Sequence, residues 1–225
     1  MKICIGDEVL LLFPEDLEKM YINEGVEAKV YRYGDEALKI YKDYCFKFRL
    51  DENSVMRLST IPTKRILLPK RSIYRIREKK SFAGYSLFYV NSKPFDEMVN
   101  IDMEHFLNEL DIIMDDMKIL TDNGVVVEDL NISNILYDGR LYFCDPGSFS
   151  FDEKPLNPLL NSSSNITSLN EFISDSVFDY TATLIDKYYQ GFAIDFDISE
   201  YIGDQVRDSV KSGETLKQYV RRIMR

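Results

Sequence analysis

The chain is poor in the residues on which several kinds of site depend. It has no tryptophan, one histidine, His105, and three cysteines, Cys4, Cys45 and Cys144, among 225 residues. The cysteines are odd in number and far apart, and no C-x-x-C occurs, so neither a zinc site nor a disulfide framework is indicated. A lone histidine inside a helical pattern is interpreted as structural and argues against a metal cluster built on histidines. Reduced, buried thiols are expected of a cytosolic protein.

Long apolar stretches are also lacking. A membrane-spanning helix needs about 20 consecutive apolar residues, and no stretch of the sequence approaches that length. The apolar run at Val9–Phe13 is brief and has acidic residues nearby, so no signal peptide is expected. The sequence therefore predicts a protein without membrane insertion and, with its reduced cysteines, a cytoplasmic location.

Acidic residues outnumber basic ones, 38 to 28, but basic residues are concentrated locally. The net charge of −10 argues against general binding to nucleic acid or to an anionic membrane. One basic run contains a single acid, Glu78, among the residues Lys64, Arg65, Lys70, Arg71, Arg75, Arg77, Lys79 and Lys80. We interpret this run as the solvated face of strands in a first lobe, with docking of an acidic partner as the alternative.

A pattern of polar residues between short apolar segments is the most informative feature present. Asp129 and Asn134 have the spacing D-x-x-x-x-N, and two short apolar strands around an Asp138–Gly139 turn lead to Asp145, in the sequence D-P-G. The turn predicts a tight hairpin. Such a hairpin would place Asp129, Asn134 and Asp145 at one end of a small sheet, facing a common cleft.

This stretch resembles the catalytic loop and metal loop of the protein-kinase-like superfamily, with D-P-G where most protein kinases have D-F-G. The resemblance implies that Asn134 and Asp145 hold Mg²⁺ and that Asp129 faces the hydroxyl that accepts the phosphate. ATP and Mg²⁺ are the cofactors that it implies.

A second anchor lies closer to the beginning of the chain. Residues 24–33 and 34–41 alternate as two strands joined by a turn near Gly34 and Asp35. The sequence Ala-Leu-Lys ending at Lys39 resembles the V-A-I-K strand, whose lysine contacts the ATP α- and β-phosphates.

The turn before this lysine departs from the family pattern. With Val30 as the reference, the three positions of G-x-G-x-x-G fall on Asn23, Gly25 and Ala28, so only the middle glycine is kept. Small residues there still allow the backbone to approach phosphate. The resemblance thus implies that Gly25, Ala28, Val30 and Lys39 contact the nucleotide.

Two further nucleotide contacts are implied. A helix at 50–58 should carry the carboxylate that pairs with Lys39; we choose Glu52, with Asp51 close behind, although an acid at a helix start often only stabilises the helix dipole. Backbone groups at Tyr89, Val90 and Asn91 would hydrogen-bond adenine just before a hinge. The strands expected on the way there are 66–69, 72–76 and 82–90.

The rest of the chain is predicted to be mainly helical. A helix at 102–122 has an acidic outer face and ends at Asn123–Gly124. Its buried stripe consists of Phe106, Leu110, Ile113, Met114, Met117 and Leu120. A loop is predicted over 148–165, and further helices over 166–179, 175–189 and 214–225. No A-P-E motif follows the loop.

The resemblance, together with these elements, implies an α+β, two-lobed protein-kinase-like fold that fills residues 1–225 as a single domain. The β-rich N-lobe would be 1–93, and a reduced helical C-lobe 94–225. Three departures concern the catalytic loop: Val127 replaces the usual histidine, Glu128 the usual Arg or Gly, and Asn131 a common lysine. The loss of that lysine removes one source of charge stabilisation.

The expected function is therefore an ATP-dependent protein kinase that acts on a protein substrate, with Ser and Thr favoured over Tyr as acceptors. Lys39 and Asp129 would be its catalytic residues. Two alternatives stay open. One is a small-molecule kinase of the aminoglycoside or choline kinase type, and the other is a nucleotide-binding or purely protein-binding pseudokinase.

Overall fold

The computed structural model describes residues 1–43, 50–92, 98–151, 158–179 and 200–224. Helices and a curled antiparallel sheet both occur, which confirms the α+β class. The chain forms two compact units. The first consists of Met1–Pro62, Leu67–Tyr89 and Asp145–Ser148, and the second of Thr63–Ile66, Val90–Cys144 and Phe149–Arg225. The kinase-like form of the two lobes stays a prediction.

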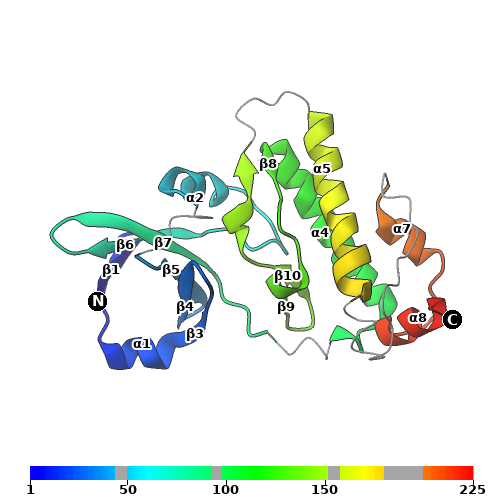
Figure 1. Ribbon diagram of the computed structural model, residues 1–225, viewed down its shortest axis with the longest axis horizontal. Coiled ribbons are helices and arrows are strands. Elements are labelled where there is room, and N and C mark those ends of the chain that lie inside the picture. Colours follow the sequence, from blue (N-terminus) through cyan, green and yellow to red (C-terminus); the bar gives the residue numbers. More distant parts are fainter. Residues whose placement is uncertain (44–49, 93–97, 152–157, 180–199, 225) are drawn as a thin grey trace. The chain divides into compact units, whose positions relative to one another are not determined.

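The first unit is built on a seven-stranded antiparallel sheet with the order β2-β1-β6-β7-β5-β4-β3 (Figure 1). Its strands are β1 (Lys2–Ile5), β2 (Glu8–Leu11), β3 (Tyr21–Glu24), β4 (Ala28–Tyr33), β5 (Glu36–Tyr41), β6 (Arg71–Ile76) and β7 (Lys80–Phe88). Gly34 has a φ of 62° and makes the β4–β5 turn where the sequence predicts it. The expected strand at 66–69 is absent, and Ile66 makes only an isolated bridge with Phe143.

Alternation along β5 divides its side chains between the two faces of the sheet. Leu38 and Ile40 join an apolar core that includes Ile3, Ile5 and Ile73. Helix α1 (Pro14–Met20), which the sequence analysis did not predict, packs Leu17 and Met20 against this core. Because successive strand residues point to opposite faces, Lys39 and Tyr41 lie on the other face.

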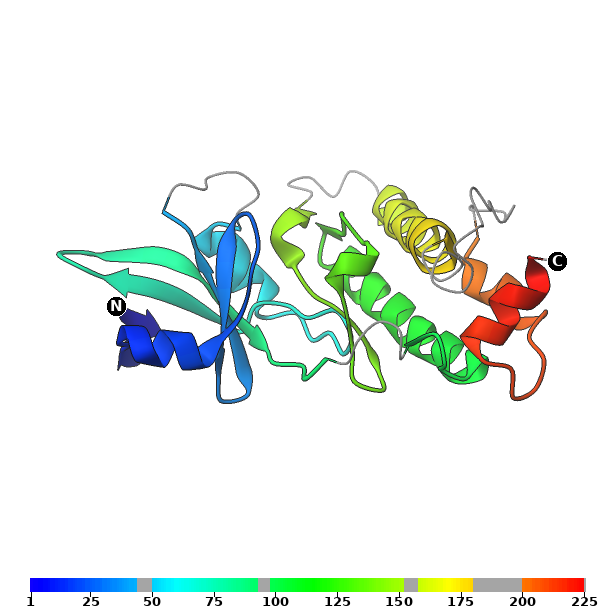
Figure 2. The ribbon, with the colours of Figure 1, turned by 60° about the horizontal axis from the view of Figure 1, so that its bottom comes forward.

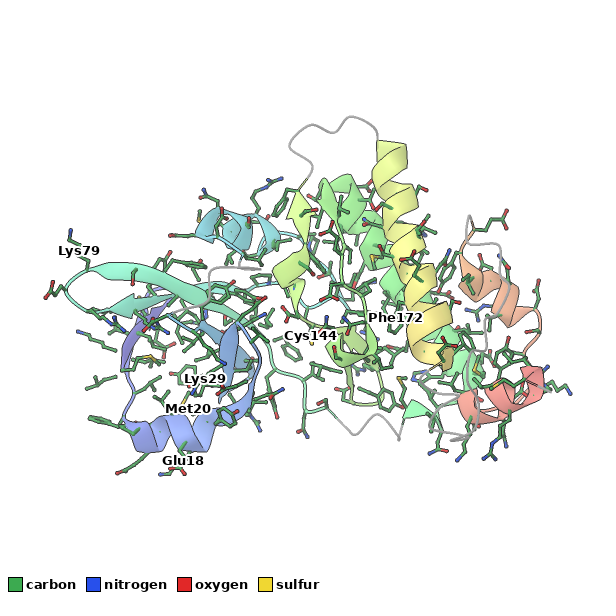
Figure 3. The ribbon with its side chains drawn as sticks, viewed as in Figure 1. Glu18, Met20, Lys29, Lys79, Cys144 and Phe172 are labelled. Atoms are coloured by element: carbon green, nitrogen blue, oxygen red, sulfur yellow. The ribbon has the colours of Figure 1, made fainter. Side chains whose placement is uncertain are left out.

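Helix α2 (Glu52–Leu58) packs against β6 and β7 in the same unit. The Tyr41 hydroxyl donates to the Leu50 carbonyl, just before this helix, at 3.2 Å. The β6–β7 hairpin reaches beyond the neighbouring strands (Figure 2), with Lys79 near its tip (Figure 3).

Most of the basic run 64–80 is neutralised within the protein. Arg71 pairs with Glu36 at 3.0 Å, and Lys70 pairs with the same carboxylate at 3.2 Å. Arg75 and Arg77 both pair with Asp43. The run therefore ties strands together as well as meeting solvent.

The second unit is organised around helix α4 (Met103–Asp122), which begins one residue after the predicted start at 102 and ends where the sequence predicts. The Asp102 carboxylate caps it by accepting from the N–H groups of Glu104 and His105, and Gly124 follows its end with a φ of 69°. Its acids are not all on an outer face, since Glu109 and Asp116 are buried.

Other elements of this unit surround α4. They are β8 (Val125–Val126), the 3₁₀ turn η1 (Ile132–Asn134), β9 (Ile135–Tyr137), β10 (Leu141–Phe143), β11 (Ser150–Phe151), α5 (Pro158–Glu171), the π-helix η3 (Phe172–Phe178), α7 (Ile202–Arg207) and α8 (Leu216–Ile223). A further 3₁₀ turn, η2 (Pro146–Ser148), belongs to the first unit. Helices α4 and α5 lie side by side (Figure 1).

The predicted loop over 148–165 is wrong in its second part, because α5 begins at Pro158. Proline is well tolerated in the first turn of a helix, where its missing N–H would have no partner in any case. Phe172, labelled in Figure 3, packs edge-on against Phe143 with ring centroids 4.7 Å apart. The predicted helix at 214–225 is confirmed as α8, whereas most of the one at 175–189 lies outside the described residues.

Candidate functional site

The first unit brings Lys39 and Asp145 together. The Lys39 ammonium donates to Asp145 Oδ1 at 2.5 Å, and Glu27 Oε2 lies 3.5 Å from the same nitrogen. The Lys39 side chain is 9% exposed, that of Glu27 19% and that of Asp145 43%. Burial by itself lowers the pKa of Lys39, but the carboxylates of Asp145 and Glu27 raise it above its ordinary value. Lys39 is therefore a buried, charged ammonium.

Gly84 fixes the backbone beneath this lysine. Strand β5 pairs with β7, and a Cβ added at Gly84 would stand 2.0 Å from the carbonyl oxygen of Lys39. The φ of Gly84 is +145°, a value that side chains strongly disfavour. Only glycine allows β7 to approach Lys39 so closely.

The predicted nucleotide contacts at Gly25, Ala28 and Val30 lie on the β3–β4 hairpin of this unit. Val30 stands directly opposite Lys39 in the β4–β5 ladder, and Ala28 is buried. Gly25 closes the turn by donating its N–H to the Ala28 carbonyl at 3.0 Å. A Cβ at Gly25 would meet no atom within 4 Å, so the turn itself does not require glycine there.

In the described part of the chain, Glu52 does not form the expected ion pair with Lys39. Helix α2 starts at Glu52, so this carboxylate lies in the first turn and accepts from the Tyr74 hydroxyl at 2.5 Å. Asp51 caps the helix by accepting from the Ser54 N–H at 2.7 Å, and this bond lowers the pKa of Asp51. Both acids thus serve local structure, and the carboxylate of Glu27 stands beside Lys39 instead.

The backbone proposed to recognise adenine already makes hydrogen bonds. The Tyr89 N–H donates to the Asp35 carbonyl at 2.9 Å, and the Tyr89 ring lies under the Arg32 guanidinium at 4.3 Å. The Val90 carbonyl accepts from the Ser92 N–H at 2.9 Å. The expected hinge covers residues 91–94, of which Asn91 and Ser92 are exposed, while Lys93 and Pro94 lie outside the described residues.

The second unit brings Asp129 and Asn134 together. Asn134 Nδ2 donates to the Asp129 carbonyl at 3.0 Å, and Asn131 Nδ2 donates to Asp129 Oδ1 at 2.6 Å. Asn131 also accepts from the Ser133 N–H at 3.0 Å, which caps η1. The exposed Asp129 carboxylate is therefore held through one oxygen, while its Oδ2 receives only a long contact of 3.5 Å from Asn134. Asn131, at the position of the missing lysine, orients this aspartate.

Backbone conformation separates Asp129 and Asp145 from the other described residues. Their φ values are 59° and 67°, and they are the only described non-glycine residues with positive φ. The left-handed region costs a side-chain-bearing residue about 1–2 kcal/mol, and such conformations cluster at functional sites. Both strained residues are aspartates of the motif identified in the sequence.

Asn134 and Asp145 each carry a side-chain oxygen of the kind that magnesium binds. The amide nitrogen of Asn134 is used in the bond to Asp129, which leaves its Oδ1 outside that contact. Asp145 Oδ1 accepts from Lys39 and from the Gly147 N–H, which leaves Oδ2 outside both contacts. In the described part of the chain no three His, Cys, Asp or Glu side chains are grouped to hold a metal.

Buried polar contacts that the sequence analysis missed hold the segment before Asp129. Asn165, on α5, accepts from the Val127 N–H at 2.8 Å and donates to the Val125 carbonyl at 3.0 Å and to the Thr121 hydroxyl at 2.8 Å. It is 1% exposed. This role was not predicted, because Asn165 falls within the predicted loop.

A second set of contacts holds the β9–β10 hairpin. Glu109 of α4 binds the Arg65 guanidinium through both oxygens, at 2.6 and 3.1 Å, and accepts from the Leu141 N–H at 3.1 Å. Asp116 accepts from the three successive N–H groups of residues 64–66. The hairpin and the segment 63–66 are thus tied to the same helix.

Comparisons with known proteins do not assign the chain to a family: no family model and no curated protein matches it. Among the described residues, no helix combines the length and the apolar composition needed to cross a membrane.

Proposed function

We propose that the chain is an ATP-dependent phosphotransferase, a protein kinase that transfers the γ-phosphate to a protein hydroxyl, with Ser and Thr preferred over Tyr. The observation that carries the proposal is that the two strained aspartates, Asp129 and Asp145, occupy the acidic positions of the D-x-x-x-x-N and D-P-G motif. The ion pair between Lys39 and Asp145, 106 residues apart in the sequence, supports it further.

Each residue has a role that its contacts suit. Lys39 exchanges its bond with Asp145 for bonds to the α- and β-phosphates. Its ammonium is paired with carboxylates, and the phosphates are anions that can replace the Asp145 carboxylate. Asp145 and Asn134 would hold Mg²⁺, which would supply positive charge to neutralise the phosphates. Asp129, oriented by Asn131, accepts or orients the proton of the attacking hydroxyl.

A pseudokinase is the second candidate, and two observations favour it. The Tyr89 N–H is already bonded to Asp35, and Lys39 is already neutralised by two carboxylates. A protein that binds partners without turning over ATP would have no need to break these contacts. Phosphate transfer separates the two candidates.

Calorimetric titration with ATP and Mg²⁺ is the first test, on the wild type, on Asp145→Asn and on the control Asp138→Asn. Asp138 lies in the β9–β10 turn and accepts from the Arg140 N–H at 3.2 Å. We expect Mg²⁺-dependent binding that Asp145→Asn weakens and Asp138→Asn leaves unchanged. Absence of binding in the wild type would refute the proposal.

Transfer of phosphate from ATP to protein acceptors, and then to small hydroxylated compounds, is the second test. Asp129→Ala should lower turnover by about 10²–10⁴-fold, the usual contribution of a general base, with nucleotide affinity kept. Transfer at the wild-type rate would remove Asp129 from the mechanism. Transfer only to small compounds would favour the small-molecule kinase.

A further inference from the structure

Lys39 has two acidic partners, Asp145 and Glu27. The proposed function requires Asp145 for another task, the binding of Mg²⁺. The described groups around its ammonium are the Asp145 and Glu27 carboxylates, the Tyr85 ring at 5.9 Å and the Tyr41 side chain. If Asp145 held a metal, as the proposed function requires, its bond with Lys39 would be weakened. Glu27 is then the remaining described carboxylate within ion-pair distance of a side chain that is only 9% exposed.

A buried ammonium needs such a partner. Removing a charge from water is costly unless an opposite charge and hydrogen bonds compensate for it. Without a second carboxylate, Lys39 would be driven to turn toward solvent or toward another acid whenever Asp145 is engaged elsewhere. Its position for phosphate would then be lost.

The turn that carries Glu27 is itself held in place. The Glu27 carbonyl accepts from the Lys42 N–H at 2.8 Å, which continues the β4–β5 ladder. The Lys42 ammonium donates to Glu24 at 2.8 Å and to the Gly25 carbonyl at 2.7 Å. Glu27 is thus fixed relative to β5, the strand that carries Lys39.

We propose that Glu27 is the positioning residue for Lys39, the part that the sequence assigned to Glu52. This inference rests on the proposed function, because it concerns the state in which Asp145 binds metal and Lys39 binds phosphate. Glu52 is engaged by the Tyr74 hydroxyl and makes no contact with Lys39 in the described structure. The second carboxylate within ion-pair distance of the lysine therefore comes from the β3–β4 turn, within the same sheet, and not from helix α2.

The test compares binding of ATP with Mg²⁺ and binding of adenosine, which has no phosphates, by calorimetry. The variants are Glu27→Gln, the matched control Glu52→Gln, Lys39→Ala and the double variant Glu27→Gln/Lys39→Ala. We expect Glu27→Gln to weaken binding of ATP about tenfold, on the order of the one-unit pKa effect of a single nearby opposite charge, and to leave adenosine binding unchanged. Glu52→Gln should change neither. In the Lys39→Ala background, Glu27→Gln should have no further effect, because the two residues act as one unit.

The outcomes separate this inference from the proposed function. If the wild type binds ATP and Glu27→Gln binds it equally well, the inference fails and the proposed function stands. Tighter binding by Glu27→Gln would make Glu27 a competitor of phosphate and overturn the inference, as would an equal loss of adenosine binding or an effect that persists without Lys39. A wild type that does not bind ATP overturns both.

Discussion

Asn165 allows a quantitative test of how the segment before Asp129 is held. The change is Asn165→Ala, with Ser164→Ala, an exposed position on the same helix, as the control. Asn165 makes three hydrogen bonds while only 1% exposed, two of them to the backbone of Val125 and Val127. The substitution leaves the Val127 N–H and the Val125 carbonyl without these partners.

The expected loss in the free energy of unfolding follows from the cost of leaving the Val127 N–H and the Val125 carbonyl without these partners. A buried polar group without a partner costs about 1–3 kcal/mol, so the pair gives about 2–6 kcal/mol before relaxation. Alanine is a better helix former than asparagine by about 0.7 kcal/mol at most, which offsets a small part. We therefore expect the free energy of unfolding to fall by roughly 3 kcal/mol, which is the middle of this range less the gain in helix propensity.

Urea unfolding followed by circular dichroism measures this difference, with the Ser164→Ala variant expected to lie within about 0.5 kcal/mol of the wild type. A loss for Asn165→Ala as small as that of the control would refute the reasoning. It would mean that the Val125–Val127 backbone does not depend on α5. Phosphate transfer should also fall in this variant, because Asp129 follows the segment after two residues.

Two further perturbations follow from the structure. Gly84→Ala places a Cβ 2.0 Å from the Lys39 carbonyl at a φ of +145°, so it should lower the free energy of unfolding by about 1–3 kcal/mol, whereas Gly25→Ala, with open space around it, should be nearly neutral by the same unfolding assay. A neutral Gly84→Ala would contradict the close approach of β7. Burial by itself raises the pKa of Glu109, but hydrogen bonds from Arg65 and the Leu141 N–H hold it below its ordinary value. The folded state thus binds its proton at lower pH than the unfolded chain, and Glu109 stabilises the fold above pH ~4.5, a contribution lost as the pH falls through the folded pKa. Glu109→Gln should make Tm depend less steeply on pH in the acid range. An unchanged slope would contradict the stabilising role of the ionised Glu109 carboxylate.

Local signals predicted several elements because those elements depend on neighbouring residues. The Asp138–Gly139 turn with its flanking apolar residues gave the β9–β10 hairpin, and Gly34 gave the β4–β5 turn. The spacing of apolar residues and the Asn123–Gly124 stop gave helix α4 almost to the residue. Each of these signals lies within a few positions of the structure that it specifies.

The partners of the buried charges were decided by tertiary structure. Residues 27 and 39 become neighbours only when β4 and β5 pair, and residue 145 reaches Lys39 from 106 positions away. The same holds for Glu109 and Asp116, which the helical pattern assigned to an acidic outer face, although the fold buries them against Arg65 and the backbone of 64–66.

The sequence by itself determined the motif residues Lys39, Asp129, Asn134 and Asp145, since residue type and spacing are local properties. Which carboxylate stands beside the lysine was decided by the tertiary structure alone. Glu52 and Glu27 are both acids at plausible positions, but the pairing of β4 with β5 places Glu27 3.5 Å from the Lys39 ammonium, and the packing of α2 against β6 directs Glu52 to Tyr74. Ion pairs depend on distances through space, which spacing along the chain does not fix.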